Sequence, residues 1–282
     1  MTADSAVTTR VVLLGTGTPN ADPLRSGPSV AVVVGDCAYL VDFGPGVVRR
    51  AAEAFASGIA ALEPTRIELA FLTHLHSDHT AGYADLILTP WVLGRAEALQ
   101  VFGPTGLLAM TQSVLKAYES DIHERLEGAE PALPTGYSVT VHEIETGPVY
   151  EDSRVRVEAV PARHGSWTAF GYRFTTADRN IVISGDTAPS QMIQEAARGC
   201  DLLVHEVYST SGFARRTPAW RAYHAQVHTS AHELARIACQ AQPGLLVLYH
   251  QLFWGVSEDE LLREVRSGYA GRVVSGQDLG VY

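Results

Sequence analysis

Short apolar runs rich in β-branched residues recur along the chain, and several of them end next to a histidine or an aspartate. Runs of this length, bounded by Gly, Pro and Asp, predict β-strands. The expected strands are Val11–Leu14, Val30–Val34, Ala38–Val41, Leu69–Leu72, Val139–Ile144, Val155–Val160, Ile181–Ile183, Leu202–Val204 and Leu245–Tyr249. Apolar residues at helical spacing predict helices at Val47–Phe55, Gly106–Tyr118, Gln191–Ala197, Ala231–Gln240 and Glu258–Val265. This order fits mixed sheets with helices outside them.

The run Leu69–Leu72 leads into the densest group of potential metal ligands in the chain. Within six residues come His74, His76, Asp78 and His79. Imidazole and carboxylate are ligands that borderline cations such as zinc prefer. A strand that ends and passes such residues to a loop predicts a metal site.

Other potential ligands also follow expected strands, since His164, Asp186 and His250 come shortly after three later apolar runs. The set suits two ions. One ion would take His74, His76 and His164. The other would take Asp78, His79 and His250, with Asp186 bridging the two. Ions ~3.5–4 Å apart would share a water, whose pKa would fall toward ~7 and give hydroxide at neutral pH.

Composition limits the remaining possibilities. The 282 residues are 46% hydrophobic and carry a net charge of −10, which disfavours dedicated nucleic-acid binding. The three cysteines are far apart and predict no disulfide framework. The N-terminus has no apolar targeting segment, and no stretch is long and apolar enough to cross a membrane, so a cytoplasmic protein without membrane contact is expected.

The H-x-H-x-D-H motif at 74–79, with the later His164, Asp186 and His250, resembles the metallo-β-lactamase superfamily. The segments 15–19 and 41–44 (GTGTP and VDFG) are similar to its ribonuclease Z-like branch, which includes tRNA 3′-processing enzymes, phosphodiesterases and arylsulfatase-like proteins. The resemblance spans nearly the whole chain. It implies one α/β domain over residues 1–282, an αββα four-layer sandwich with the metals at one edge of the sheets. Two divalent ions are implied, usually Zn²⁺, with Mn²⁺ or Fe²⁺ as alternatives.

The resemblance also implies catalytic roles. Asp78 would hold the second ion and orient the attacking water. In the branch, a histidine before a helix protonates the leaving group, and here that residue would be His228. Its place in a loop is consistent with a capping box formed by Ser230 and Glu233. From a further family-like segment, His205 or Glu206 would orient a liganding histidine.

The expected function is hydrolysis of a small ester, with a phosphodiester preferred, metal-bound hydroxide as the nucleophile and His228 as the general acid. Only 21 residues separate His164 from Asp186, which leaves no room for the long arm with which tRNA-processing members grip tRNA. A small-molecule substrate and no nucleic-acid partner are therefore expected, and family resemblance favours a homodimer.

Several alternatives stay open. A carboxylic ester, a lactone or a sulfate ester is the second choice of substrate, ahead of a tRNA 3′-processing endonuclease. A non-catalytic binding subunit is disfavoured because every ligand position is filled, and a di-iron redox protein is disfavoured by His79 and the chain length. The substrate-binding residues are not identified; Arg125 or His123 could meet an anion. Some of the aromatic residues near the motifs could wall a pocket: Trp167, Phe170, Tyr208, Phe213 and Trp254.

Overall fold

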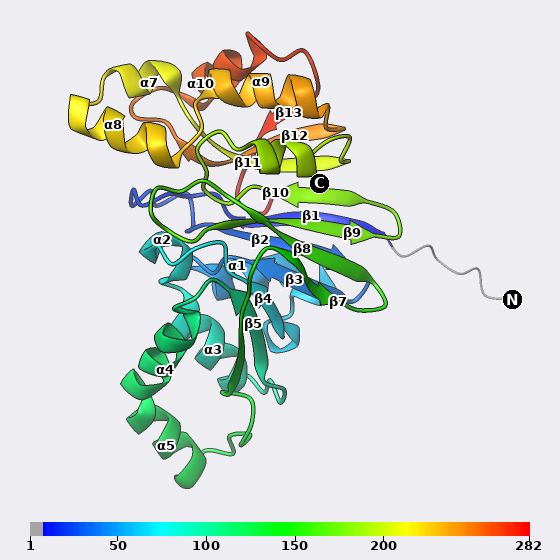
Figure 1. Ribbon diagram of the computed structural model, residues 1–282. Helices are drawn as coiled ribbons and strands as arrows, with labels where there is room; N and C mark the ends of the chain where they lie inside the picture. Colours follow the sequence, from blue (N-terminus) through cyan, green and yellow to red (C-terminus); the bar gives the residue numbers. More distant parts are fainter. Residues whose placement is uncertain (1–7) are drawn as a thin grey trace, which may run out of the picture.

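The computed structural model describes residues 8–282, and in this part of the chain two β-sheets pack face to face with helices on both outer sides (Figure 1). The predicted αββα sandwich is confirmed. Residues 1–7, which make up most of the N-terminal stretch without an apolar targeting segment, lie outside the described residues. Within residues 8–282, no helix is both long and apolar enough to span a membrane.

The first sheet follows chain order from one edge to the other. Its strands are β1 (Thr9–Gly15), β2 (Ser29–Val34), β3 (Cys37–Val41), β4 (Leu69–Phe71), β5 (Leu99–Gly103) and β6 (Val139–Glu143). The pairs from β1 to β3 are antiparallel, and those from β3 to β6 are parallel.

The second sheet also follows chain order and is built from the later strands. They are β7 (Gly147–Glu151), β8 (Val155–Pro161), β9 (Phe170–Thr176), β10 (Asn180–Ile183), β11 (Leu202–Tyr208), β12 (Leu245–Leu252) and β13 (Val273–Ser275). Neighbours are antiparallel from β7 to β10 and parallel from β10 to β13.

Helices divide between the two halves of the chain. The first half contains α1 (Val47–Ala56), the 3₁₀ turns η1 (Ala60–Leu62) and η2 (Pro64–Arg66), α2 (Ser77–Thr80), α3 (Tyr83–Val92), α4 (Leu107–Ala117) and α5 (Glu119–Glu127). The second half contains α6 (Gln191–Ala196), α7 (Thr210–Ala214), α8 (Pro218–Val227), α9 (Ala231–Ala241) and α10 (Glu258–Arg266).

Both faces of strands such as β1 and β2 are buried, so these strands are almost wholly apolar rather than alternating. In β1, Val11 and Leu13 pack in the core between the sheets, while Val12 and Leu14 pack in the core beneath α1 and α3. A third core lies between the second sheet and α9 and α10. The C-terminal residue Tyr282 exchanges backbone hydrogen bonds of 2.9 Å with Val11, which covers the free edge of β1.

The predicted start of α9 is confirmed. Ser230 is the N-cap; its hydroxyl accepts the Glu233 N–H, and the Glu233 carboxylate accepts the Ser230 N–H. This cap fixes where α9 begins. His228 is therefore held in the short connection between α8 and α9 and does not lie on the face of α9.

Candidate metal centre and active site

The motif at 74–79 begins just beyond the buried strand β4. His74 is fully buried, and His76 is the residue before α2, whose single turn carries Asp78 and His79. The tight path from strand to helix brings the imidazoles together: the His74 ring centroid lies 4.7 Å from that of His76 and 4.2 Å from that of His79.

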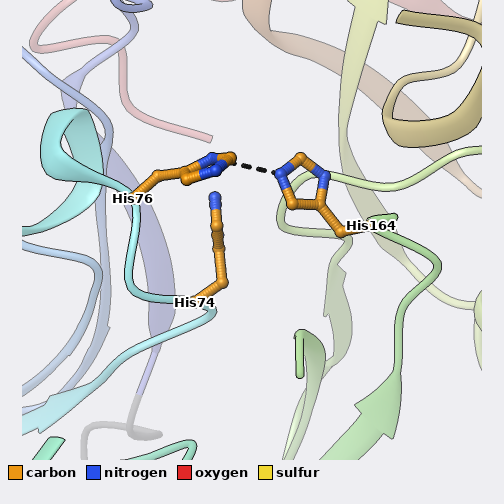
Figure 2. Close-up of side chains that lie close together, drawn as sticks. All are labelled: His74, His76 and His164. Atoms are coloured by element: carbon orange, nitrogen blue, oxygen red, sulfur yellow. Dashed lines mark hydrogen bonds between the residues drawn. The ribbon is translucent and has the colours of Figure 1, made fainter. Parts of the chain in front are cut away.

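Three histidines form the first group of donors (Figure 2). Nδ1 of His76 lies 3.1 Å from Nε2 of His164, and the figure shows the His74 ring directed at the space between them. Nitrogens that bind one tetrahedral zinc at ~2.0–2.1 Å would lie about 3.4 Å apart, close to this spacing. His164 donates from Nδ1 to the Val227 carbonyl at 2.9 Å, which leaves the lone pair of Nε2 facing the group.

Asp42, directly after β3, orients two rings of the motif. It accepts from the Thr73 N–H at 2.8 Å, from the Thr73 hydroxyl at 3.0 Å and from Nδ1 of His79 at 2.8 Å. Because the Thr73 hydroxyl gives its proton to Asp42, its 3.0 Å bond with Nδ1 of His74 is donated by the ring. Both rings are thus fixed with Nε2 facing the group, the nitrogen that would bind a metal. The sequence assigned no role to Asp42, although it follows a strand as the other site residues do.

Asp78, His79 and His250 form the second group. Oδ2 of Asp78 lies 3.1 Å from Nε2 of His250 and 3.5 Å from Nε2 of His79. His250 is the extra residue of a β-bulge in β12, between the partners of Glu206 and Val207, and its φ is 43°. A bulge re-aims one side chain of a strand, and here it turns the buried His250 ring into the site.

Asp186 lies between the two groups. Its Oδ2 is 3.5 Å from Nε2 of His79, and its Oδ1 is 3.4 Å from Nδ1 of His250. The preceding Gly185 has a φ of 59°, and a Cβ there would lie 2.7 Å from the Phe170 carbonyl oxygen. Only glycine fits this turn, which carries the chain from β10 to the bridging position.

The charges of the site fit a cation. Burial lowers the pKa of His74 well below its usual value, and that of His76 to about 4, so both rings are neutral donors. Burial also acts to lower the pKa of His79, but Asp186, Asp42 and Asp78 outweigh it and raise that pKa well above the usual value. The same carboxylates that favour a proton on His79 would attract a divalent cation, and binding of that cation would release the proton.

Several donor atoms of the site also lack partners within residues 8–282. Buried atoms without a hydrogen bond there include Nε2 of His74, Nε2 of His79, Oδ1 of Asp186 and Nδ1 of His250. Buried polar atoms rarely remain unpaired, and a bound metal ion would satisfy these. The side chains present therefore fit the metal ions that the sequence predicts.

His228 and Glu206 form a pair beside Asp186. Nδ1 of His228 lies 3.5 Å from Oε2 of Glu206 and 3.8 Å from Oδ2 of Asp186. Glu206 accepts the Thr229 N–H at 2.7 Å, and burial together with Asp186 raises its pKa well above the usual value. Burial lowers the pKa of His228 to about 4. Together with Asp186 and His250, His228 also forms a group of donors that could hold a metal ion.

The two residues predicted to orient a ligand differ in position. Glu206 faces His228, as described. His205 instead bonds through Nδ1 to the Glu206 backbone carbonyl, and in the described chain it makes no hydrogen bond or ring contact with a candidate ligand. Arg125, a suggested anion contact, lies on α5 and is paired with Asp121 and with Glu130, which follows that helix. The helix α5 is at the far end of the molecule from α8 (Figure 1).

Of the aromatic residues that the sequence suggested as a pocket lining, only some lie next to the donors. A cavity of about 320 Å³ opens above the donors, and Trp254 lines it. Trp167 packs edge-on against His76, with 4.8 Å between ring centroids. Tyr208 and Phe213 stack behind Trp254, and Phe170 is buried in the core between the sheets. The cavity also has lining residues that the sequence did not single out: Arg216, Trp220, Tyr223 and His224.

Proteins that match this chain over nearly the whole length of both chains are named for a nuclease, ribonuclease Z. The chain is 35% identical over 276 residues to the ribonuclease Z of Mycobacterium bovis (strain BCG / Pasteur 1173P2), covering 95% of this chain and 96% of the relative. Among solved structures it is similar to a metallo-β-lactamase fold protein from Bacillus subtilis, with a TM-score of 0.75, 18% identity, and coverage of 98% and 99% of the two chains. The short form of human tRNase Z gives a TM-score of 0.70 at 20% identity, over 97% and 98% of the chains.

These relatives correct the expected substrate. The predictions of a small-molecule ester and of no nucleic-acid partner were wrong, because the matching relatives are named ribonuclease Z. The short interval between His164 and Asp186 does not separate this chain from them, since the match spans 96% of the Mycobacterium bovis protein and leaves it little room for an extra arm. Net charge misled for a physical reason: it describes the whole surface, whereas phosphate binding depends on the few groups at the site.

The model of the β-lactamase superfamily domain matches residues 38–251, a range that contains all seven candidate metal ligands. The predicted family and fold are confirmed, and so is the predicted enzyme class, a metal-dependent hydrolase of ester bonds. The chain belongs to the β-lactamase superfamily, and the relatives that it matches over nearly their whole length are named ribonuclease Z.

Proposed function

We propose that this protein is a metal-dependent endoribonuclease that hydrolyses a phosphodiester bond at the 3′ side of tRNA. The observation that carries this proposal is the match to ribonuclease Z over nearly the full length of both chains. The site agrees with it, since donors for two ions surround a cavity that opens to solvent.

In this proposal two divalent ions, Zn²⁺ by preference, are held by the seven predicted ligands. His74, His76 and His164 would hold one ion, Asp78, His79 and His250 would hold the other, and Asp186 would contribute to both. When bound, such ions neutralise phosphate oxygens and lower the pKa of a water. The protein's own contribution is to fix the donors. Asp42 fixes His79 by accepting a hydrogen bond from its Nδ1, and it fixes His74 through the Thr73 hydroxyl, which accepts from Nδ1 of His74 and donates to Asp42.

Asp78 and His228 act on opposite sides of the reacting phosphate. The attacking water loses one proton to solvent, and Asp78 accepts a hydrogen bond from its remaining O–H and orients its oxygen toward phosphorus. As the bond from that oxygen to phosphorus forms, the bond from phosphorus to the leaving nucleotide oxygen breaks. His228 gives a proton to that leaving oxygen, which avoids release of a strongly basic alkoxide.

Glu206 explains how a buried histidine can supply that proton. The Glu206 carboxyl lies 3.5 Å from Nδ1 of His228, and burial together with Asp186 raises its pKa, which favours its protonated form. A proton donated to Nδ1 places the other ring proton on Nε2, and the His228 ring lines the cavity. As Nε2 protonates the leaving oxygen, Nδ1 takes the Glu206 proton. His228 then stays neutral throughout, as its lowered pKa requires.

The test is cleavage of a precursor tRNA with a 3′ trailer by the zinc- or manganese-loaded protein. We expect one cut near the 3′ end of the tRNA, lost in Asp78→Ala. His228→Asn should lose most of the rate. The matched control is His232→Asn, which changes an exposed histidine four residues along the chain and should cleave like the wild type. Hydrolysis of bis-p-nitrophenyl phosphate without any cleavage of the precursor would contradict the proposal.

A further inference from the structure

The helix α8 presents aromatic side chains on one face next to the metal centre. Trp220, Tyr223 and His224 are spaced i, i+3 and i+4, which places them side by side on a helix. Trp220 is 49% exposed and Tyr223 is 42% exposed, so their rings are not part of the core. His224 is buried between Trp220 and Trp254, with ring centroids 5.3 Å and 4.4 Å away. We call Arg216, Trp220, Tyr223, His224 and Trp254 the aromatic wall.

An arginine without a counter-ion completes the aromatic wall. The Arg216 guanidinium lies over the rings of Trp220 and Trp254, 5.3 Å and 5.4 Å from their centroids. Within residues 8–282 no carboxylate pairs with it, and its buried Nε has no hydrogen-bond partner. Arg25, which lines a different pocket, is unlike Arg216 because it pairs with Glu258 at 2.8 Å. Arg216 is thus held in place by cation–π contacts and keeps its donors free for an anion.

The aromatic wall and the metal centre share one cavity. The cavity of about 320 Å³ is lined by Arg216, Trp220 and Tyr223 together with His76, Asp78 and His228. The contact runs through His224, whose ring centroid is 5.6 Å from that of His228. A chain bound at the metals therefore has an aromatic surface and a free guanidinium on the side where His228 would protonate the leaving oxygen.

From this placement, and resting on the proposed function, we propose that the aromatic wall binds the unpaired nucleotide that carries the leaving oxygen. Its base stacks on the exposed ring of Trp220, with Tyr223 beside it, and a phosphate oxygen meets Arg216. Stacking suits any base because each has a π-face, and arginine supplies bidentate donors to phosphate. Trp220 and Arg216 then determine substrate affinity, while His228 and the metal ligands perform the reaction.

Charge favours a nucleotide over a second copy of the chain as the occupant of the aromatic wall. Within residues 8–282 the aromatic wall holds one cation without a paired carboxylate, Arg216, which attracts a phosphate and would repel the same guanidinium of a second copy seated on this face. Two exposed rings and one guanidinium also make a small patch, far below the area that a stable dimer needs.

The test is a double-mutant cycle on a precursor tRNA. The substrate carries an abasic nucleotide either on the leaving-group side of the cut or on the opposite side. On the leaving-group side, removal of the base should raise KM roughly 10-fold for the wild type. It should cost Trp220→Ala almost nothing further, because the ring that stacks on the base is already absent. On the opposite side, the abasic change should affect both proteins equally.

Two variants control for structure. Trp220→Phe keeps a ring and should recover most of the lost affinity. Tyr118→Ala removes a ring of similar exposure at the start of α5 and should leave KM unchanged. Binding is measured in parallel with 2-aminopurine at the leaving position, whose fluorescence should be quenched by the wild type and not by Trp220→Ala.

The outcomes separate this inference from the proposed function. Cleavage with additive effects of the abasic change and Trp220→Ala overturns the inference and leaves the nuclease standing. Quenching that depends on Trp220 without cleavage supports the inference and contradicts the nuclease. If no RNA binds, both fail. If Trp220→Ala turns a wild-type dimer into a monomer in sedimentation, the aromatic wall is a subunit contact and the inference also fails.

Discussion

The seven predicted metal ligands, which we call the floor, and the aromatic wall beside them are built in opposite ways. On the floor, His74, His79 and His164 are buried, and each is fixed by a hydrogen bond from its outer nitrogen to the protein. On the aromatic wall, Trp220 and Tyr223 are half exposed and are held by ring contacts alone. Rigid donors suit a reaction that needs fixed geometry, and exposed rings suit a substrate that must enter and leave.

This difference predicts two kinds of mutational effect. Changes on the floor should act on metal binding and kcat, because they alter groups that touch the reacting atoms. Changes on the aromatic wall should act mainly on KM, because stacking supports the bound substrate and the transition state alike. The comparison fails if a floor variant changes KM alone.

The largest effect is expected for Asp186→Asn. The amide cannot bridge two cations with two anionic oxygens, and it leaves His79 and His250 without the carboxylate between them. We expect fewer metal ions per chain by elemental analysis and no detectable cleavage. Asp121→Asn, at an exposed carboxylate on α5, is the control and should keep both metal and activity. Full metal content with wild-type turnover would show that Asp186 is not a metal ligand.

His228→Asn comes next and separates its two possible roles. As a general acid, His228 should contribute on the order of 10²–10⁴-fold to kcat on RNA, whose leaving oxygen is basic. It should contribute little for bis-p-nitrophenyl phosphate, because p-nitrophenolate leaves without a proton. Metal content should stay the same. Loss of metal together with an equal loss on both substrates would instead make His228 a ligand, which its distance to Asp186 allows.

Asp42→Asn should have an intermediate effect that comes from positioning. The amide can no longer accept every bond that Asp42 receives from Thr73 and His79, so both liganding rings lose their fixed orientation. Outer partners of this kind typically contribute 10–100-fold in metal affinity. Competition with a zinc chelator measures this shift. Activity should return at high zinc, whereas a directly catalytic role for Asp42 would leave kcat low under saturating metal.

The sequence predicted the floor because each of its side chains follows an apolar run that forms a strand. Residue identity and position at a strand end were enough to place His74, Asp186 and His250 in one set. Their exact arrangement depended on features without a sequence pattern, such as the bulge that turns His250 and the Asp42 contact across the sheet. Those features arise from long-range pairing of strands.

Apart from Trp254, the residues of the aromatic wall were not predicted, for a related reason. The segment from Thr210 to Val227 shows neither a continuous apolar stripe nor a capping box, so α7 and α8 were not expected. The helix α3 was also missed, since Pro90 lies inside it and its residues are apolar on several sides. Strands β5, β7, β9 and β13 are short or interrupted by polar residues, and pairing with their neighbours defines them. A substrate contact made of exposed residues on such elements is visible only once the chain is folded.

The smallest effect is expected in the pH dependence of stability, where the buried and the exposed sides should differ again. Burial lowers the pKa of His205 from 6.5 to about 4, and that of His224 on the aromatic wall likewise to about 4. Between these pH values the unfolded chain binds protons that the folded chain does not, so stability is fully present above pH 6.5 and is lost as pH falls toward 4. For fully buried His205 this share is on the order of 3 kcal/mol. For His224, which lines the open cavity, water screens the charge and the share should be smaller.

Urea unfolding of the metal-free protein at pH 7.5 and pH 5 would measure this loss of stability. His205→Asn keeps a donor for the Glu206 carbonyl and removes the larger share, so it should lose less stability on acidification than His224→Asn does. The opposing effects of His79 and His250 are the same in both variants. Equal losses in the two variants would show that His224 on the aromatic wall is as closed to water as the buried His205.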